Sequence, residues 1–475
     1  MIGEFFRLLS DWGTIDTWTV LIAALAAMAC ALPGVFLLLR RQSMLGDALS
    51  HTVLPGIVLA FLASQAMLSA GWLSPQTLQT AQHGILFVGA LGTGILTALA
   101  SEWVRRRGQV ESSAALGVVY TTLFASGLLL LRLFADNVHI DADCVLFGAV
   151  ENLVIDPATR AGAARFTALV LGLNLALVVL LYKELRICTF DPALATTLGI
   201  NARWVHLGLV AITSATLVTA FEIVGSILVV AMLIVPAATS RLCTDRLSTM
   251  IVLSLVFAAG SAVMGHVAAI TLPAMVFQPL GFAEVQDAST SGMMTLAAGG
   301  LFVAAFVFSP RYGLVSRTWQ RARLGVRIAS EDLLGRLFRK AEHVEPESSA
   351  SATEALGISP VLRRLAAWRL QHRGLVSRTA GQWQLTTSVY EAAAALVRSH
   401  RLWEAYLASH QDSMPDDQLH FSAHRAEHYI DSATASQLAS ELNQPAADPH
   451  GKPIPEAGGA PPGSPALDQP RDEAT

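Results

Sequence analysis

The sequence predicts an all-α polytopic membrane protein with eight or nine transmembrane helices, followed by a mainly α extension. Of the 475 residues, 53% are hydrophobic and only 14% are charged, whereas a soluble domain carries about 25% charged residues. The deficit of charge is concentrated in the first two thirds of the chain, and the composition changes after about residue 310. These two observations predict a membrane domain over residues 1–315 and a soluble part behind it.

The membrane domain contains nine apolar runs. A helix that crosses a bilayer needs ~20 largely apolar residues. The run at 226–240 is short and bounded by glycine and proline, so it could be a half-helix, which leaves the count at eight or nine. The runs are 18–39, 48–68, 84–103, 115–135, 165–182, 205–222, 226–240, 249–271 and 293–309.

Basic residues predict the orientation of these runs. Every odd-numbered run is followed by arginine or lysine, as at 40–41, 105–107 and 183–186, while the loop at 136–156 is acidic. Because positively charged loops stay in the cytoplasm, the N-terminus is expected outside and the C-terminus in the cytoplasm of a bacterial inner membrane.

Two patterns exclude whole classes of protein. Cys30, Cys144, Cys188 and Cys243 are far apart and form no CxxC pair, so the sequence shows neither a disulfide framework nor a zinc finger. The chain contains no GxxxxGK[ST] and no enzyme active-site pattern.

His206 and His266 lie in or near apolar runs, where a packed or interfacial histidine is commoner than a ligand.

The run LRRQSMLGDALSHTVLPG, residues 39–56, contains two ionisable residues at the start of a span. Asp47 and His51 are four residues apart, so on a helix they share one face. Each ionisable group inside a membrane segment costs ~2.5–3.5 kcal/mol, so such groups usually mark a pathway. A carboxylate with an imidazole suits Mn, Fe or Zn. The alternative is that Asp47 caps the helix and His51 is an interfacial residue.

Two further runs accompany this pair. CTFDPALATTLGINARW, residues 188–204, predicts a short alanine-rich helix between Asp191 and Gly199 that could insert into a cleft of a partner, or could be an ordinary loop helix. VGSILVVAMLIVPAAT, residues 224–239, places Pro236 inside an apolar run, which a kinked helix also explains.

Together these three runs resemble the manganese, zinc and iron group of ABC transporter permeases, over about residues 20–310. The resemblance implies that Asp47 and His51 belong to the metal pathway. It implies that the segment with Phe190, Asp191, Ala195 and Gly199 docks on a separate ATPase. A metal-binding substrate-binding protein and a second permease, identical or different, are the other partners implied. The cargo would be Mn2+ or Fe2+, with Zn2+ as a third candidate.

The extension begins with a winged-helix-like pattern over residues 325–390. SPVLRRLAAWRLQHRGLVSRTAGQWQLTTSVYEAA reads as a helix, a short hairpin and a second helix. Arg363, Arg364 and Arg369 lie along the first helix, where they could contact DNA phosphates or form a solvated basic face.

Histidine and glutamate then recur at helical spacing within residues 391–445. A single ion could be bound by side chains that converge from one helix face, and imidazole with carboxylate suits Mn, Fe, Co, Ni or Zn. The alternative is a polar surface helix. The candidate ligands are His400, Glu404, His420, His424, Glu427 and His428.

Both features resemble the diphtheria-toxin-repressor family of metal-dependent regulators, over roughly residues 328–456. The matching runs include SEDLLGRLFR, RSHRLWE, HFSAHRAEHYID and NQPAADPHGKPIP. The resemblance assigns His400, Glu404 and His420 to an ancillary metal site. It assigns His424, Glu427 and His428 to a primary site, with Asp332 as a further ligand. His424 stands where relatives carry Cys or Glu, and Gly335 stands where manganese sensors place a carboxylate.

The sequence therefore predicts a metal-ion permease with a cytoplasmic, metal-sensing, helical extension and a disordered tail over 446–475. It is not expected to be an enzyme. The alternative is a membrane-anchored, metal-dependent regulator whose partner is DNA. The Asp47–His51 pair and the complete coupling segment favour the permease, because a mere anchor would not need them.

Overall fold

The computed structural model describes residues 12–71, 75–134, 150–277, 288–342, 360–379, 382–411 and 415–456. The chain divides into two compact units, Met1–Ser316 and Arg317–Thr475. Each unit is described by itself. The predicted acidic loop at 136–156 lies largely outside the described residues.

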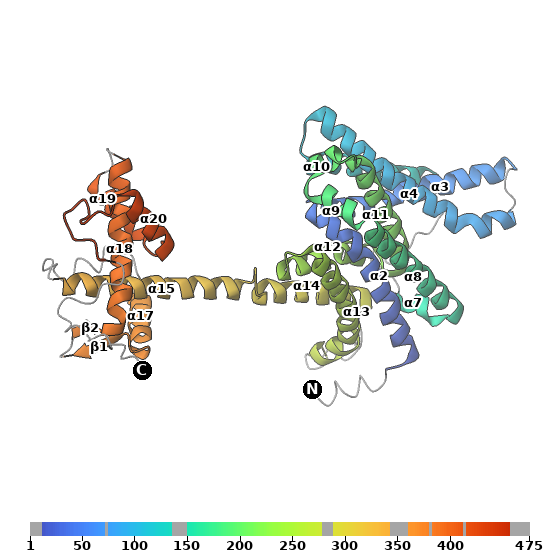
Figure 1. Ribbon diagram of the computed structural model, residues 1–475. Helices are drawn as coiled ribbons and strands as arrows, with labels where there is room; N and C mark the ends of the chain where they lie inside the picture. The colour runs from blue at the N-terminus through green and yellow to red at the C-terminus, as the bar shows by residue number, and fades with distance from the viewer. Residues whose placement is uncertain are drawn as a thin grey trace, which may run out of the picture. The chain divides into compact units, whose positions relative to one another are not determined.

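The first unit is built from helices alone in its described part (Figure 1). Eight of them are long and apolar enough to cross a membrane, which confirms the predicted all-α polytopic fold. The helices are α2 (Thr14–Leu39), α3 (Met44–Ser69), α4 (Pro75–Gly108), α5 (Ser112–Phe134), α7 (Val150–Ile155), α8 (Pro157–Leu180), α9 (Tyr182–Phe190), α10 (Pro192–Thr197), α11 (Ala202–Val224), α12 (Ser226–Cys243), α13 (Leu247–Phe277) and α14 (Thr290–Phe308).

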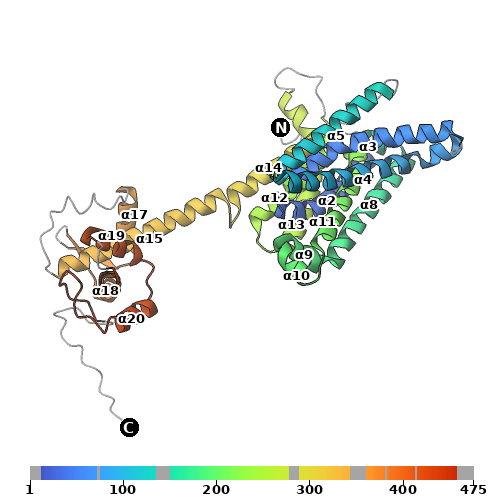
Figure 2. The ribbon, with the colours of Figure 1, turned by 90° about the horizontal axis from the view of Figure 1, so that it is seen from above.

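Helix α2 forms the centre of this unit. It packs against α8, α11, α12 and α13, while α3 runs beside α4 in both views (Figures 1 and 2). Small residues let the backbones approach closely. At Gly34 an added Cβ would lie 1.8 Å from the carbonyl oxygen of Leu233 on α12. Glycine is therefore required where α2 crosses α12.

The seventh apolar run is the short helix that the sequence predicted. Gly225, with φ of 77°, separates α11 from α12. The apolar part of α12, Leu228–Cys243, is shorter than the eight spanning helices, and Pro236 lies within α12. A proline inside a helix leaves the carbonyl four residues earlier without its backbone donor. The run is consequently a short helix that is separated from α11 at Gly225 and continues through Pro236.

The second unit contains helices and one hairpin. Strands β1 (Val376–Thr379) and β2 (Gln382–Leu385) pair antiparallel with Val376 opposite Leu385. One apolar core joins the end of α15 to α17, β1 and α18 through Phe338, Leu370, Val376 and Val389. The helices are α15 (Leu314–Ala341), whose first residues belong to the first unit, α17 (Pro360–His372), α18 (Thr387–His410), α19 (Asp416–Ala426) and α20 (Ser432–Glu441). The order helix, hairpin, helix follows the predicted pattern.

The ordered part of this unit extends beyond residue 445, where the sequence suggested a disordered tail. Ala447 and Pro453 form a β-bridge, and Ile454 joins a second apolar core with Leu402 and Leu438. The buried guanidinium of Arg401 donates to Pro453 O and, at 2.7 Å, to Glu342 Oε2. Residues 446–456 are thus held against α18, because an arginine and an apolar side chain anchor a proline-rich segment whose composition alone suggests disorder.

Candidate metal centres

Four candidate ligands from distant parts of the chain meet in the second unit. Asp332 comes from α15, His424 from α19, and Glu427 and His428 from the turn that ends α19. Their ligand atoms all lie within 4.8 Å of one another. His428 Nε2 lies 3.1 Å from Asp332 Oδ1, and His424 Nε2 lies 3.6 Å from the same oxygen. We call Asp332, His424, Glu427 and His428 the primary group.

The geometry of the primary group fits a bound cation. Ligands placed about 2.0–2.2 Å from an ion, at tetrahedral or octahedral angles, are separated by about 3.0–3.5 Å. Asp332 is 3% exposed, and its buried Oδ1 faces the ring nitrogens of His428 and His424. A buried carboxylate oxygen of this kind is costly unless something binds it. Two imidazoles and two carboxylates suit Mn2+, Fe2+ or Zn2+.

A second group lies beside the first. His400 Nε2, Glu404 Oε1 and His420 Nδ1 are separated by 3.1, 2.7 and 3.2 Å. His400 and Glu404 are buried on α18, whereas the His420 side chain is 62% exposed. We call these three residues the ancillary group. It is open to solvent on the His420 side, so an ion could exchange there more readily than in the primary group.

The two groups are joined through one carboxylate. Glu427 Oε2 lies 2.8 Å from His400 Nδ1, while Glu427 Oε1 lies 2.8 Å from His424 Nδ1. His400 therefore presents Nε2 to the ancillary group and Nδ1 to Glu427. A carboxylate on the distal nitrogen of a ligating histidine fixes the tautomer of the ring and its orientation.

Electrostatics keep the carboxylates ionised. Burial by itself raises the pKa of Glu427, but hydrogen bonds with His400 and His424 lower that pKa to about 2. The pKa of Glu404 is also about 2, because hydrogen bonds with His400 and His420 outweigh burial. Burial lowers the pKa of His428, but its hydrogen bonds with Asp332 and Glu331 raise that pKa to about 9. Carboxylates are consequently ready as ligands at neutral pH, whereas His428 must first release a proton.

Glu331 belongs to this arrangement although the sequence did not single it out. Its Oε2 lies 2.9 Å from His428 Nδ1, and its Oε1 accepts a hydrogen bond of 2.8 Å from Arg327. Glu331 thus orients the His428 ring so that Nε2 faces Asp332. The only signal in the sequence was its position next to Asp332.

The two ionisable residues of the membrane unit also share a face. His51 Nε2 lies 3.6 Å from Asp47 Oδ1, and each side chain is 46% exposed. The His51 ring lies against Tyr120 and Phe124 of α5, with ring centroids 6.0 and 5.2 Å apart. Because α3 begins at Met44 with Ser43 before it, Asp47 is not the capping residue. The pair is therefore half-exposed.

The segment expected to dock on a partner is a short helix with an apolar outer face. Asp191 caps α10 by accepting hydrogen bonds of 3.0 and 2.9 Å from the amides of Ala193 and Leu194. Gly199, with φ of 80°, ends the segment. Phe190, Leu194 and Leu198 are 63, 48 and 58% exposed, whereas Ala195 is fully buried. Ala195 therefore faces the neighbouring helices of the first unit. The outer leucines, which the sequence did not single out, are the residues available for contact.

The arginines of the hairpin segment lie on α17. Arg364 is exposed, Arg369 is half-buried, and Arg363 lies in the same helix. Val361, Leu365 and Trp368 of this helix are 70, 48 and 60% exposed. Basic and apolar side chains are thus mixed on the outside of α17.

The fold and these sites define a class of protein: a polytopic membrane transport subunit that carries a helical metal-binding extension. The chain belongs to the ABC 3 transport family, whose model matches residues 15–309. A second model, for the metal binding and dimerisation domain of iron dependent repressors, matches residues 386–456. Members of the first family are membrane subunits rather than enzymes, since a separate ATPase hydrolyses ATP.

Three relatives illustrate these matches. The manganese transport system membrane protein MntD of Bacillus subtilis is 38% identical over 64% of this chain and 95% of its own length. The zinc transport system membrane protein TroD of Treponema pallidum is 37% identical over 63% of this chain and 75% of its own. A probable metal transport system membrane protein of Chlamydia trachomatis is 26% identical over 93% of this chain and 96% of its own, so that alignment includes both units.

Proposed function

We propose that this chain is the permease subunit of an ABC importer for divalent transition-metal ions, with Mn2+ or Fe2+ favoured over Zn2+. The observation that carries the proposal is the Asp47–His51 pair, which lies at the start of a membrane span in a chain of this family. The protein would lie in the bacterial inner membrane with its C-terminus in the cytoplasm, as the basic residues after odd-numbered spans suggest.

In this proposal Asp47 and His51 contact the ion during passage. The carboxylate supplies a negative charge and the imidazole a lone pair, and together they replace part of the water shell of the ion. Tyr120 and Phe124 hold the His51 ring in place from one side. A single pair on a half-exposed face binds an ion weakly, which suits release as well as capture.

The partners follow from the same proposal. The outer face of α10, with Phe190, Leu194 and Leu198, would contact the ATPase. A substrate-binding protein would deliver the ion on the opposite side of the membrane. A second permease, identical or different, would complete the half-exposed pathway.

The extension would bind the same ions as regulatory ligands. The primary group offers four His or carboxylate ligands and the ancillary group offers three. The family model of the repressor metal-binding domain covers all of these residues except Asp332. Occupancy would report cytoplasmic metal to the permease. DNA binding by α17 is a second candidate, favoured by the exposed Arg364 on this helix, but the transport relatives support the permease as the main activity.

Uptake of radioactive Mn2+ in a bacterial strain that lacks its own importers tests the proposal. Asp47→Asn preserves the shape of the side chain and removes its charge, so uptake should fall to the background level while the amount of protein in the membrane stays normal. Glu184→Gln makes the same chemical change on α9, away from the pair, and should transport like the unaltered protein. Normal uptake by Asp47→Asn would exclude the pair from the pathway.

A further inference from the structure

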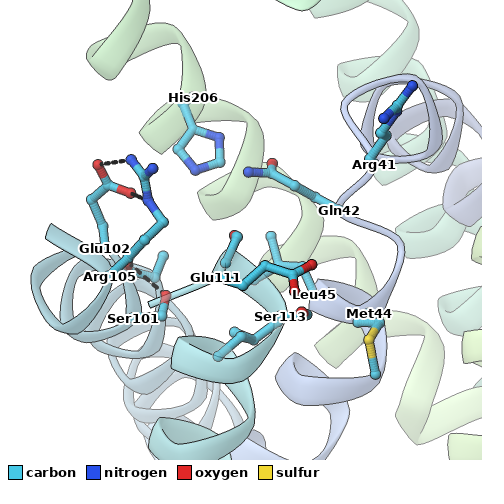
Figure 3. A pocket seen from close by; sticks show the side chains of 13 residues that line it. Arg41, Gln42, Met44, Leu45, Ser101, Glu102, Arg105, Glu111, Ser113 and His206 are labelled. Carbon is cyan, nitrogen blue, oxygen red and sulfur yellow. Dashed lines mark hydrogen bonds and ion pairs between the residues drawn. The ribbon is translucent and has the colours of Figure 1, made fainter. Parts of the chain in front are cut away.

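A pocket lined by charged, polar and apolar side chains lies where several spans of the first unit end. It has a volume of about 120 Å³ and is lined from the link between α2 and α3, the end of α4, and the starts of α5 and α11. Gln42 and His206 point toward each other on one side, with the Glu102–Arg105 pair and Glu111 around the same space (Figure 3). The Asp47–His51 pair, the primary and ancillary groups and α10 contribute no residue to this pocket.

Two atoms of the pocket lack the partners that buried polar atoms normally have. Gln42 Oε1 and His206 Nδ1 are buried and form no hydrogen bond in the described structure. Nearby, the buried Nη1 of Arg40 has no partner either. Unpaired buried polar atoms are rare because each loses its water without compensation. Their concentration here indicates that the pocket is made for a polar ligand.

Arg41 stands at the rim of the pocket in an unusual backbone conformation. It ends α2 with φ of 58°, and the amides of Arg41 and Gln42 donate to the carbonyls of Leu38 and Leu37 at 3.0 and 2.9 Å. This is the helix ending in which glycine is the usual residue. The protein places an exposed arginine where glycine would fit more easily, so the side chain has a use that the turn itself does not require.

The charges in the pocket are of both signs. Glu102 is already bound, since Arg105 donates to it at 2.8 and 2.7 Å and Arg106 donates at 2.5 Å. Arg41 and Glu111 form no ion pair within the described residues and are left for a ligand. The first turn of α5, at Ser112 and Ser113, adds backbone amides without helical partners, which favour an anion.

We propose that this pocket binds the headgroup of a zwitterionic phospholipid that carries a primary ammonium group, with the phosphate near Arg41 and His206 and the ammonium donating hydrogen bonds to Glu111. A ligand with both charges matches a pocket that offers both, whereas free phosphate would leave Glu111 unmatched. The pocket lies at the ends of spanning helices, the level at which basic pockets meet lipid headgroups. Met44, which lines the pocket, is 58% exposed. Trp103, which follows Glu102 in α4, is 64% exposed, and exposed tryptophan is typical of this level.

Native mass spectrometry of the full-length chain in detergent tests the proposal. The probes are dioctanoyl phosphatidylethanolamine, dioctanoyl phosphatidylcholine, whose ammonium hydrogens are replaced by methyl groups, and inorganic phosphate. The ethanolamine lipid should bind more tightly than the other two. Arg41→Gly should weaken it about tenfold, as expected for loss of a hydrogen bond to a charged group, without lowering the unfolding temperature, because glycine suits this turn.

Two controls match this variant. Gln109→Gly makes the same backbone change at a residue with φ of 50° outside the pocket, and Arg107→Gln removes one charge from the end of α4. Both should bind the ethanolamine lipid like the unaltered chain. Equal binding by Arg41→Gly, equal binding of the two lipids, or full competition by inorganic phosphate would overturn the proposal. Loss of ATPase co-purification in Arg41→Gly with unchanged lipid binding would also overturn it, in favour of a protein contact.

Discussion

Metal binding to the primary group should release a proton and weaken as the pH falls. The pKa of His428 is about 9 because Asp332 and Glu331 hydrogen bond to its ring. At pH 7, two units lower, about one ring in a hundred is neutral, which corresponds to about 2.7 kcal/mol of binding free energy lost to proton competition. The affinity for Mn2+ should therefore fall about tenfold between pH 8 and pH 7, and further below.

Calorimetry of residues 317–475, which contain their own apolar cores, measures this effect. Titration in two buffers with different ionisation enthalpies should give about one proton released per ion at pH 7. His428→Ala should abolish binding to the primary group, while His410→Ala, an exposed histidine outside both groups, should change nothing. Affinity independent of pH together with normal binding by His428→Ala would refute the assignment of His428 as a ligand.

The same pKa predicts how the metal-free unit responds to pH. A histidine with a raised pKa stabilises the folded state fully below its unfolded value of ~6.5, and this contribution is lost as the pH rises through about 9. Bound metal should reverse this trend, because the ion requires the neutral ring. Urea unfolding at several pH values, with and without Mn2+, would show that the free energy of unfolding falls with rising pH in the metal-free unit and rises in the metal-bound unit.

Three further predictions concern the fold and the partners. Gly34→Ala should lower the yield of folded protein in size-exclusion chromatography, since its Cβ would lie 1.8 Å from Leu233 O and overpacking costs about 1–3 kcal/mol; Gly117→Ala, which meets open space, should behave normally. Leu194→Glu on the exposed face of α10 should leave the chain folded but prevent co-purification of the ATPase, whereas Ala195→Glu, which buries a charge, should reduce folding itself. A chain that ends at Ser316 should transport metal without inhibition by internal metal, and retained inhibition would place the sensor elsewhere.

The spans were predictable because each depends on local composition. Twenty apolar residues indicate a bilayer helix without knowledge of its neighbours. Gly225 and Pro236 likewise predicted from the sequence that α12 is short. The buried face of α10 was not predictable in this way. Ala195 and Leu194 are adjacent apolar residues, and only the packing of α10 against the bundle decides that the first is buried and the second exposed.

In the candidate metal site, too, the ligands that are close in sequence were predictable, whereas those brought together only by the fold were not. His424, Glu427 and His428 share one turn, so helical spacing predicts their convergence. Asp332 lies some ninety residues earlier, and only resemblance to a known family suggested it; Glu331 was missed because an acidic residue on a charged helix carries no signal of its own. The pocket of Gln42 and His206 combines elements far apart in the sequence, and no local pattern indicates that their buried atoms lack partners.

The most direct measurement of the central claim is metal uptake by proteoliposomes that contain this chain, its ATPase and any second permease encoded beside it, with the metal-loaded substrate-binding protein supplied on the receptor side. The account predicts ATP-dependent accumulation of Mn2+ or Fe2+ that is lost in Asp47→Asn and retained in Glu184→Gln. Accumulation of metal that is unaffected by Asp47→Asn, or its absence in a complex that hydrolyses ATP in response to the loaded binding protein, would contradict the account.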